Sequence, residues 1–203
     1  ATNRTAIESD AFPLLVKPRR GRGSRGIARV DSHADLTVHL TNTDYDTDAL
    51  LLQEFVEGTE FTTSVVATRE NRLLGVVPKE AVEKQGSTVT GVTRTAPAVS
   101  DDCRGIFKTL GPHGPLNVQQ IVDEQGRPHT IEINPRFSST SCLTAAAGID
   151  EFDLLVRDAL GESVTAPESF EADLYIRRYE DHVFVPAAEF EGESSRRRAE
   201  LID

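Results

Sequence analysis

The sequence predicts an α+β fold built on antiparallel strands, and two observations indicate it. Short apolar and β-branched runs separated by turn residues fill the segment from Leu50 to Val77, which is typical of an antiparallel meander. Farther along, the runs 116–122 and 130–134 flank the turn Asp123-Glu124-Gln125-Gly126, which predicts a β-hairpin. Helical patterns are short, so an antiparallel sheet with a few covering helices is expected.

The N-terminal part predicts the order strand, loop, strand, helix. Phe12–Pro18 is an apolar run typical of a buried strand, and Ile27–Val30 is a second one. A loop rich in glycine and arginine lies between them. Ser32, followed by Asp35, has the pattern of a helix N-cap.

An acidic, turn-rich stretch at residues 42–48 predicts a subdomain boundary, because the composition changes abruptly there. We therefore expect one subdomain over residues 1–48 and a second over residues 49–203.

The second subdomain continues with elements of both kinds. After the meander, we expect a strand at 89–92, a helix at 96–110 that ends at Gly111, and the hairpin at 116–134. Two short helices at 140–147 and 151–160 and a last hairpin formed by 173–179 and 183–187 complete the prediction.

The charge composition narrows the classes of partner. Lysine and arginine number 22 against 33 aspartate and glutamate residues, a formal net charge of −11. A duplex nucleic acid is not expected as a partner, because phosphate binding needs a positive field. Arginine far outnumbers lysine, which fits either adaptation to salt or a genome of high GC content.

Two further compositional features bear on location and metal chemistry. No apolar run approaches the roughly 20 residues that a membrane span requires, so no membrane partner is expected. Cys103 and Cys142 lie too far apart for a zinc motif and are too few for a disulfide framework. We expect two reduced cysteines in a cytoplasmic protein.

The loop from Lys17 to Gly26 holds five cations and three glycines between two strands. Glycine lets the backbone fold closely over a polyanion, and backbone N–H groups and lysine can meet phosphate oxygens. The segment is not a Walker loop, because the order GxxxxGK[ST] is absent. An arginine–glycine segment that contacts RNA and a merely solvated loop remain alternatives.

The predicted hairpin carries polar side chains at alternating positions. Side chains alternate between faces along a strand, so Glu132 and Asn134 project together, while Ile131 and Ile133 are expected in the core. Gln119 projects from a matching face of the partner strand. One carboxylate and amide oxygens are hard ligands that suit Mg²⁺ or Mn²⁺, and an ordinary solvated hairpin is the alternative.

These two segments, together with the run from Gln53 to Glu60 between them, resemble in this order the ATP-grasp superfamily, and most closely the ATP-grasp domains of the carbamoyl-phosphate synthase large chain. The resemblance covers about residues 12–148 and rests on three motifs. Phe-Pro-Leu-Leu-Val-Lys-Pro with its glycine-rich loop is similar to the lid of the family. Gln-Glu-Phe-Val-Glu-Gly-Thr-Glu is similar to the hinge, and Asn-Val-Gln with Ile-Glu-Ile-Asn-Pro-Arg to the metal-binding strands.

The resemblance implies a fold with a lid subdomain and a larger antiparallel-sheet subdomain that bind ATP and Mg²⁺ between them. It implies residues that bind ATP: Lys17, Arg19, Gly21, Gly23, Ser24, Gly26, Glu54, Phe55, Val56 and Glu60. Of these, Glu54 and Val56 are expected to contact the adenine chiefly through their backbone, and Glu60 the ribose. It also implies residues for metal binding and catalysis: Gln119, Glu132 and Asn134 for the metal, and Lys17 and Arg136 for phosphoryl transfer.

The resemblance further implies an activity. Family enzymes phosphorylate a carboxylate with ATP and let an amine attack the acyl phosphate, so small carboxylates and amines are the expected substrates. The domain that precedes the lid in the family is expected outside this chain, and a homo-oligomer is possible. The alternative is an ATP-binding module without turnover, acting as a sensor or a partner subunit. The acceptor-specific residues are expected between Pro78 and Thr95.

Overall fold

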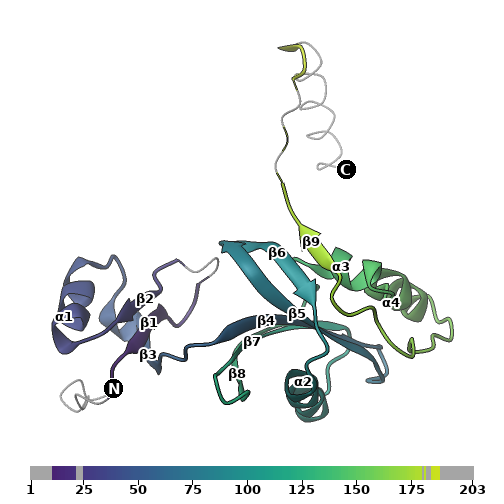
Figure 1. The fold of residues 1–203 in the computed structure, drawn as a ribbon, viewed down its shortest axis with the longest axis horizontal. Helices are drawn as coiled ribbons and strands as arrows, with labels where there is room; N and C mark the ends of the chain where they lie inside the picture. The colour runs from purple at the N-terminus through teal and green to yellow at the C-terminus, as the bar shows by residue number, and fades with distance from the viewer. Residues whose placement is uncertain (1–10, 22–24, 180, 182–183, 188–203) are drawn as a thin grey trace.

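The computed structural model describes residues 11–21, 25–179, 181 and 184–187, and it contains two antiparallel sheets (Figure 1). The small sheet has three strands in the order β2-β1-β3, and helix α1 packs against it. Its elements are β1 (Leu14–Pro18), β2 (Ala28–Val30), α1 (His33–Asn42), the 3-10 turn η3 (Thr47–Ala49) and β3 (Leu50–Glu54).

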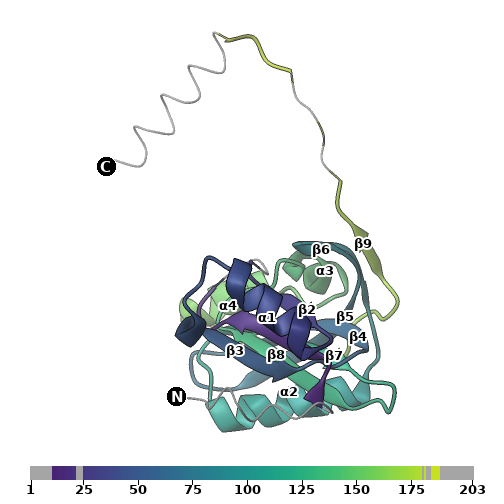
Figure 2. The ribbon, with the colours of Figure 1, turned by 90° about the vertical axis from the view of Figure 1, so that its left-hand side faces the viewer.

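Local signals account for the elements of the small sheet. Val16 is fully buried with Leu14 and Val30, which confirms the predicted buried strands. The Ser32 hydroxyl accepts a hydrogen bond from the Asp35 backbone N–H at 3.1 Å, which confirms the predicted N-cap of α1. Strands β1 and β2 pair as a hairpin, from Leu14 opposite Val30 to Val16 opposite Ala28 (Figure 2).

Strand β3 corrects one part of the sequence prediction. We expected Leu50 to begin the larger subdomain, but β3 pairs with β1 along its whole length, from Leu14 opposite Glu54 to Pro18 opposite Leu50. This pairing moves the proposed subdomain boundary from residue 48 to residues 55–58, which join the two sheets (Figure 1). Glycine is required at position 58, since a Cβ there would collide with the carbonyl oxygen of Val122.

The large sheet has six strands in the order β8-β7-β4-β5-β6-β9. Its strands are β4 (Thr59–Ala67), β5 (Leu73–Gln85), β6 (Ser87–Thr93), β7 (Pro115–Val122), β8 (Pro128–Asn134) and β9 (Tyr175–Arg177). Its helices are α2 (Pro97–Leu110), α3 (Ser141–Ala146) and α4 (Glu151–Ala159). The chain thus has the α+β class and the mainly antiparallel arrangement predicted from the sequence.

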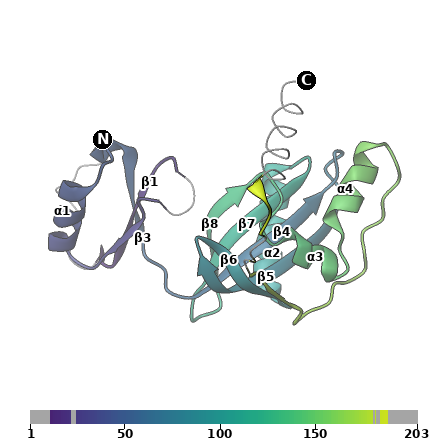
Figure 3. The same ribbon diagram turned by 90° about the horizontal axis from the view of Figure 1, so that it is seen from above.

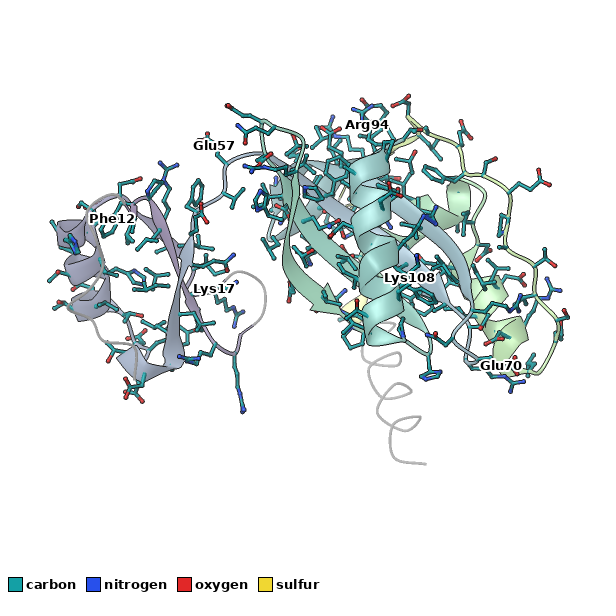
Figure 4. The ribbon with its side chains drawn as sticks, turned by 90° about the horizontal axis from the view of Figure 1, so that it is seen from below. Phe12, Lys17, Glu57, Glu70, Arg94 and Lys108 are labelled. Carbon is teal, nitrogen blue, oxygen red and sulfur yellow. The ribbon has the colours of Figure 1, made fainter. Side chains whose placement is uncertain are left out.

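The two faces of the large sheet have different covers. Helix α2 packs on one face of the sheet (Figure 4). On that face Cys103 joins Val65, Val76 and Val118 in a buried cluster. Helices α3 and α4 lie at the other face (Figure 3), where Leu154 belongs to a second cluster. Both cysteines are free, and burial raises the pKa of the Cys103 thiol to about 12.

Two predictions for the large sheet are wrong. The predicted last hairpin does not form, because β9 pairs with β6 instead and residues 184–186 are not in a strand. Val183 lies outside the described residues. Ile131 and Ile133 were expected in the core, but Ile133 is exposed and Ile131 is only half-buried. The reason is that β8 is the edge strand of the sheet, where side chains have a neighbouring strand on one side alone.

Among the described residues, no helix is both long enough and apolar enough to cross a membrane.

Candidate functional site

Strands β7 and β8 bring the predicted metal ligands together. Gln119 lies directly opposite Glu132, and Asn117 lies directly opposite Asn134. Directly paired residues of an antiparallel ladder project from the same face, and positions two apart share it. The four side chains therefore lie on one face of the hairpin, as the alternation of the sequence predicts.

The chemistry of this donor set fits a divalent cation. In the described part of the chain, Glu132 and Gln119 have no side-chain hydrogen bond or ion pair, and the Asn134 side-chain nitrogen is buried without a partner. Their oxygens are thus not engaged by other protein groups. No cluster of three or more His, Cys, Asp or Glu side chains exists among the described residues, so a metal here would depend on Glu132 and the amides.

These side chains line a hollow of about 330 Å³ that also reaches Gly21, in the loop after β1. Thr62, which donates to Asn117 Oδ1 at 2.7 Å, belongs to the floor of the hollow. Six of the predicted site residues line it: Gly21, Glu60, Gln119, Glu132, Asn134 and Arg136. Gly21 of the glycine-rich segment and the β7–β8 hairpin therefore meet at one cavity, although they are about 100 positions apart in the chain.

Lys84 also lines this hollow, and the sequence prediction did not include it among the site residues. Its Nζ lies 2.5 Å from Glu60 Oε1, so the carboxylate that we expected to bind ribose is ion-paired in the structure. Lys84 precedes the tight turn at Gly86, where β5 and β6 meet. The Gln85-Gly86-Ser87 turn was the available signal, because it predicts a hairpin whose end could carry Lys84 toward the site.

The other predicted residues of the lid that the structure describes do not line the hollow. Lys17 is half-buried on β1, on the side of the small sheet that faces the larger part (Figure 4). Arg19 donates from Nε to the Asp48 carbonyl at 3.1 Å, so this side chain is held against the turn before β3. Gly26 has a φ of 73°, a left-handed backbone conformation that favours glycine. Gly23 and Ser24 lie outside the described residues.

The predicted hinge residues follow β3 directly. The Phe55 backbone N–H donates to the Pro13 carbonyl at 3.2 Å, and its ring lies 4.5 Å from the Arg29 guanidinium carbon. This N–H is therefore not available to a base. Glu54 ends β3, and Val56 lies in the connection between the two sheets. That their backbone groups contact the adenine stays a prediction.

Arg136 and Arg94 differ in how they are held. Arg136 is exposed at the rim of the hollow, and its Nη1 donates to the Phe137 carbonyl at 2.9 Å. Arg94, in the segment where we expected acceptor-specific residues, is paired with Glu80 at 2.7 Å and with Asp173 at 2.5 Å. These two partners raise the pKa of Arg94 and tie the chain before β9 to the sheet.

A buried polar cluster lies on the same face of the sheet as the hollow, beneath helices α3 and α4. Lys79 is fully buried, and its Nζ donates to Ser64 Oγ and to Thr144 Oγ1, both at 2.7 Å. The Ser64 hydroxyl in turn donates to Glu151 Oε1 at 3.0 Å. The lysine and the glutamate thus share Ser64 as a bridge between the sheet and the two helices.

Burial lowers the pKa of Lys79 from 10.5 to about 8, and the nearby negative charge of Glu151 opposes this shift. The unfolded chain then holds more protons than the folded chain between about pH 8 and pH 10.5, so stability rises with pH in that window. We expect the wild type to gain up to about 3 kcal/mol relative to Lys79→Met as the pH is raised. Urea denaturation of both proteins from pH 7.5 to 10.5 measures this difference, and parallel pH curves would contradict it.

Comparison with known protein families gives two matches to sequence models. The family described as ATP-grasp in the biosynthetic pathway with Ter operon matches residues 46–182. The C-terminal part of D-ala D-ala ligase matches residues 1–87. The two matches together include both sheets.

Curated relatives include enzymes of two kinds. A D-alanine–D-alanine ligase of Pelotomaculum thermopropionicum is 31% identical over 164 residues, which cover 71% of this chain and 51% of the relative. A carbamoyl phosphate synthase large chain of Clostridium perfringens is 26% identical over 168 residues, which cover 75% of this chain and 15% of the relative. The chain thus spans about half of the first protein and a small part of the second.

Solved structures confirm the fold. The biotin carboxylase domain of the Hydrogenobacter thermophilus 2-oxoglutarate carboxylase, solved with ADP, magnesium and bicarbonate, has a TM-score of 0.67 and 20% identity, covering 81% of this chain and 40% of that one. At this identity the likeness concerns the fold. Since the first family model matches more than half of the residues, the chain belongs to the ATP-grasp family.

Proposed function

We propose that the chain binds ATP and Mg²⁺ between its two sheets and is the ATP-binding part of a ligase that joins a carboxylate to an amine. The observation that supports this most is the hollow that Glu132 and two amide side chains line together with Gly21 and Arg136, because these three side chains have no other partner among the described residues. The relatives support the reaction class, because the D-alanine–D-alanine ligase and the carbamoyl phosphate synthase are both ligating enzymes by name.

In the proposed reaction, residues of the two sheets have different roles. A carboxylate oxygen attacks the γ-phosphorus of ATP, the bond to the β-γ bridging oxygen breaks, and ADP leaves. Glu132, Gln119 and Asn134 would hold Mg²⁺, which neutralises phosphate charge when bound. Lys17, Lys84 and Arg136 supply further positive charge around the transferred group. The amine then attacks the acyl carbon, and inorganic phosphate leaves with one oxygen of the carboxylate.

The narrower proposal, a carbamoyl-phosphate synthase-like ligase, rests on the similarity of motifs and on one group of relatives. The D-alanine–D-alanine ligases support the same chemistry with a different carboxylate. Because this chain covers only part of either relative, the acceptor belongs to the whole protein, and we propose that both a carbonate and an amino acid should be tried as carboxylates.

Oxygen isotope transfer tests the reaction class. The full-length protein is incubated with MgATP, an amine donor and either ¹⁸O-labelled bicarbonate or ¹⁸O-labelled D-alanine. An acyl phosphate requires ¹⁸O to appear in the released inorganic phosphate, because the carboxylate oxygen leaves with phosphorus. Unlabelled phosphate formed at the same rate without any carboxylate would mean simple ATP hydrolysis. Tight ATP binding with no turnover on a broad panel of carboxylates would favour the ATP-binding module instead.

Lys17→Ala tests the assignment of the lid strand. Lys17 is half-buried near the end of β1, and its side chain makes no hydrogen bond or ion pair in the described part of the chain, so its removal should leave the fold intact. Loss of one phosphate-binding cation should weaken MgATP binding about tenfold, or about 1.4 kcal/mol. Isothermal titration calorimetry measures the affinity, and Lys108→Ala on α2 is the matched control. Unchanged affinity would remove Lys17 from the site.

A further inference from the structure

Strand β5 has an unpaired edge along its first half, and this edge is recessed, since Leu74 and Val76 are only 2% and 6% exposed. Residues 73–80 pair with β4 on one side, whereas the pairing with β6 on the other side covers only Lys79–Gln85. The last contact on that side is the bond from the Arg94 N–H to the Pro78 carbonyl, after which the chain turns away into α2. In the part of the chain that the structure describes, no strand pairs with the outer edge of Leu73–Val77.

This open edge lies at the base of a hollow of about 600 Å³, the larger of the two hollows described here. The start of α2 forms one wall, with Ser100, Asp101 and Arg104. Ile149 and the segment 166–170 form the other. The two walls stand on opposite faces of the sheet, because α2 packs with the Val76 cluster and Ile149 packs with the Val77 cluster. None of these residues lines the candidate nucleotide site.

We propose that this groove binds one extended peptide segment, which adds as a strand to the open edge of β5. Unpaired backbone groups of an edge strand offer a ladder of hydrogen bonds to another chain, and peptide-binding domains use such edges. The five residues Leu73–Val77 span about 16 Å, at roughly 3.3 Å per residue. Walls on both faces admit a lone strand, but they exclude the edge of a second folded sheet, which carries helices of its own.

The two walls define the chemistry of the peptide. Side chains alternate between faces along an added strand, so one set meets Ile149 and Phe170 and the other set meets the polar residues of α2. The rim carries two exposed carboxylates, Asp101 and Glu168, against the single guanidinium of Arg104, in a chain with a net charge of −11. The preferred peptide therefore alternates apolar and basic residues.

A synthetic peptide of alternating lysine and valine, capped at both ends, is the probe. We expect it to bind with a dissociation constant at or below about 100 µM in calorimetry. Bound peptide should also slow hydrogen exchange of those backbone amides in Leu73–Val77 that point away from β4, while exchange at the β7–β8 turn stays unchanged. The same peptide with N-methylated backbone nitrogens keeps its charge and side chains but cannot form the ladder, so its affinity should fall at least about tenfold.

Two variants place the binding in the groove. Ala166 is exposed on the wall, and Ala166→Trp should fill the groove and weaken binding about tenfold or more; Ala159→Trp on the exposed side of α4 is the control. Asp101→Lys should weaken binding of the basic peptide, whereas Glu124→Lys at the β7–β8 turn should not. Each substitution is at an exposed position, so circular dichroism should show an unchanged fold.

Several results would overturn the proposal. Equal binding of the N-methylated peptide would mean that charge alone attracts the probe. The probe can also be compared with a version that has glutamate in place of lysine. If neither peptide binds up to millimolar concentration, the groove takes no strand. Slow exchange of Leu73–Val77 without peptide, together with a dimer in light scattering, would make a second copy of the chain the occupant. Binding that Ala166→Trp leaves unchanged would put the peptide elsewhere.

Discussion

Replacing Glu151 with alanine is expected to lower the free energy of unfolding by about 3 kcal/mol at pH 7. Glu151 is fully buried at the start of α4, where it accepts from Ser64 and lies near the Lys79 ammonium. The substitution leaves a fully buried cation without its opposite charge, and among the described residues that cation has two hydroxyl groups as its hydrogen-bond partners. Urea denaturation followed by circular dichroism measures the loss.

The double variant Lys79→Met, Glu151→Ala separates loss of charge balance from loss of packing. Because the unpaired cation is gone, the double variant should be more stable than Glu151→Ala alone. Glu124→Ala, at the exposed turn between β7 and β8, is the control and should change stability by less than about 0.5 kcal/mol. If Glu151→Ala were as stable as this control, the buried cluster would not hold the helices to the sheet.

The second large effect concerns Glu132→Gln. Glu132 is the only carboxylate among the three proposed metal ligands, and amide oxygens bind Mg²⁺ weakly on their own. Glutamine keeps the shape of the side chain, and Glu132 is exposed on an edge strand, so the fold should survive. We expect Mg²⁺ to raise the affinity of the wild type for ATP. In the variant this Mg²⁺-dependent gain in affinity should be smaller by at least about tenfold. Calorimetric titration of ATP with and without MgCl₂ gives the comparison.

Glu124→Gln is the matched control for that titration, because it removes the same charge from the same hairpin at its far turn. It should leave both affinities unchanged. Full retention of Mg²⁺ dependence in Glu132→Gln would instead identify the β7–β8 face as an ordinary solvated hairpin.

Local patterns in the sequence were enough to predict the parts of the fold that depend on neighbouring residues. Alternation and the turn at Asp123–Gly126 predicted that Glu132 and Gln119 share a face, and the register places them directly opposite each other. The N-cap at Ser32 follows from residues three positions apart. The glycine after α2 likewise marked its end, since Gly111 has the left-handed conformation that favours glycine.

Pairings between distant segments were not predictable in the same way. The run Leu50–Glu54 is an apolar strand that could pair with either β1 or β4. Its sequence alone therefore does not predict the observed pairing with β1. Lys79 resembles any lysine of a strand, and only the approach of Thr144 and Glu151 from two helices explains its burial. Lys84 reaches the candidate site because β5 continues to Gln85, well past the Val77 end that we predicted.

A crystal structure with Mn²⁺ and a non-hydrolysable ATP analogue tests the central claim most directly. The proposal predicts an anomalous peak for the metal at the Glu132 carboxylate, with the amide oxygens of Gln119 and Asn134 nearby. It also predicts that the phosphates lie between this face and the loop that contains Gly21, with the base at Glu54 and Val56. A nucleotide bound elsewhere, or a metal that does not contact Glu132, would contradict the proposed site.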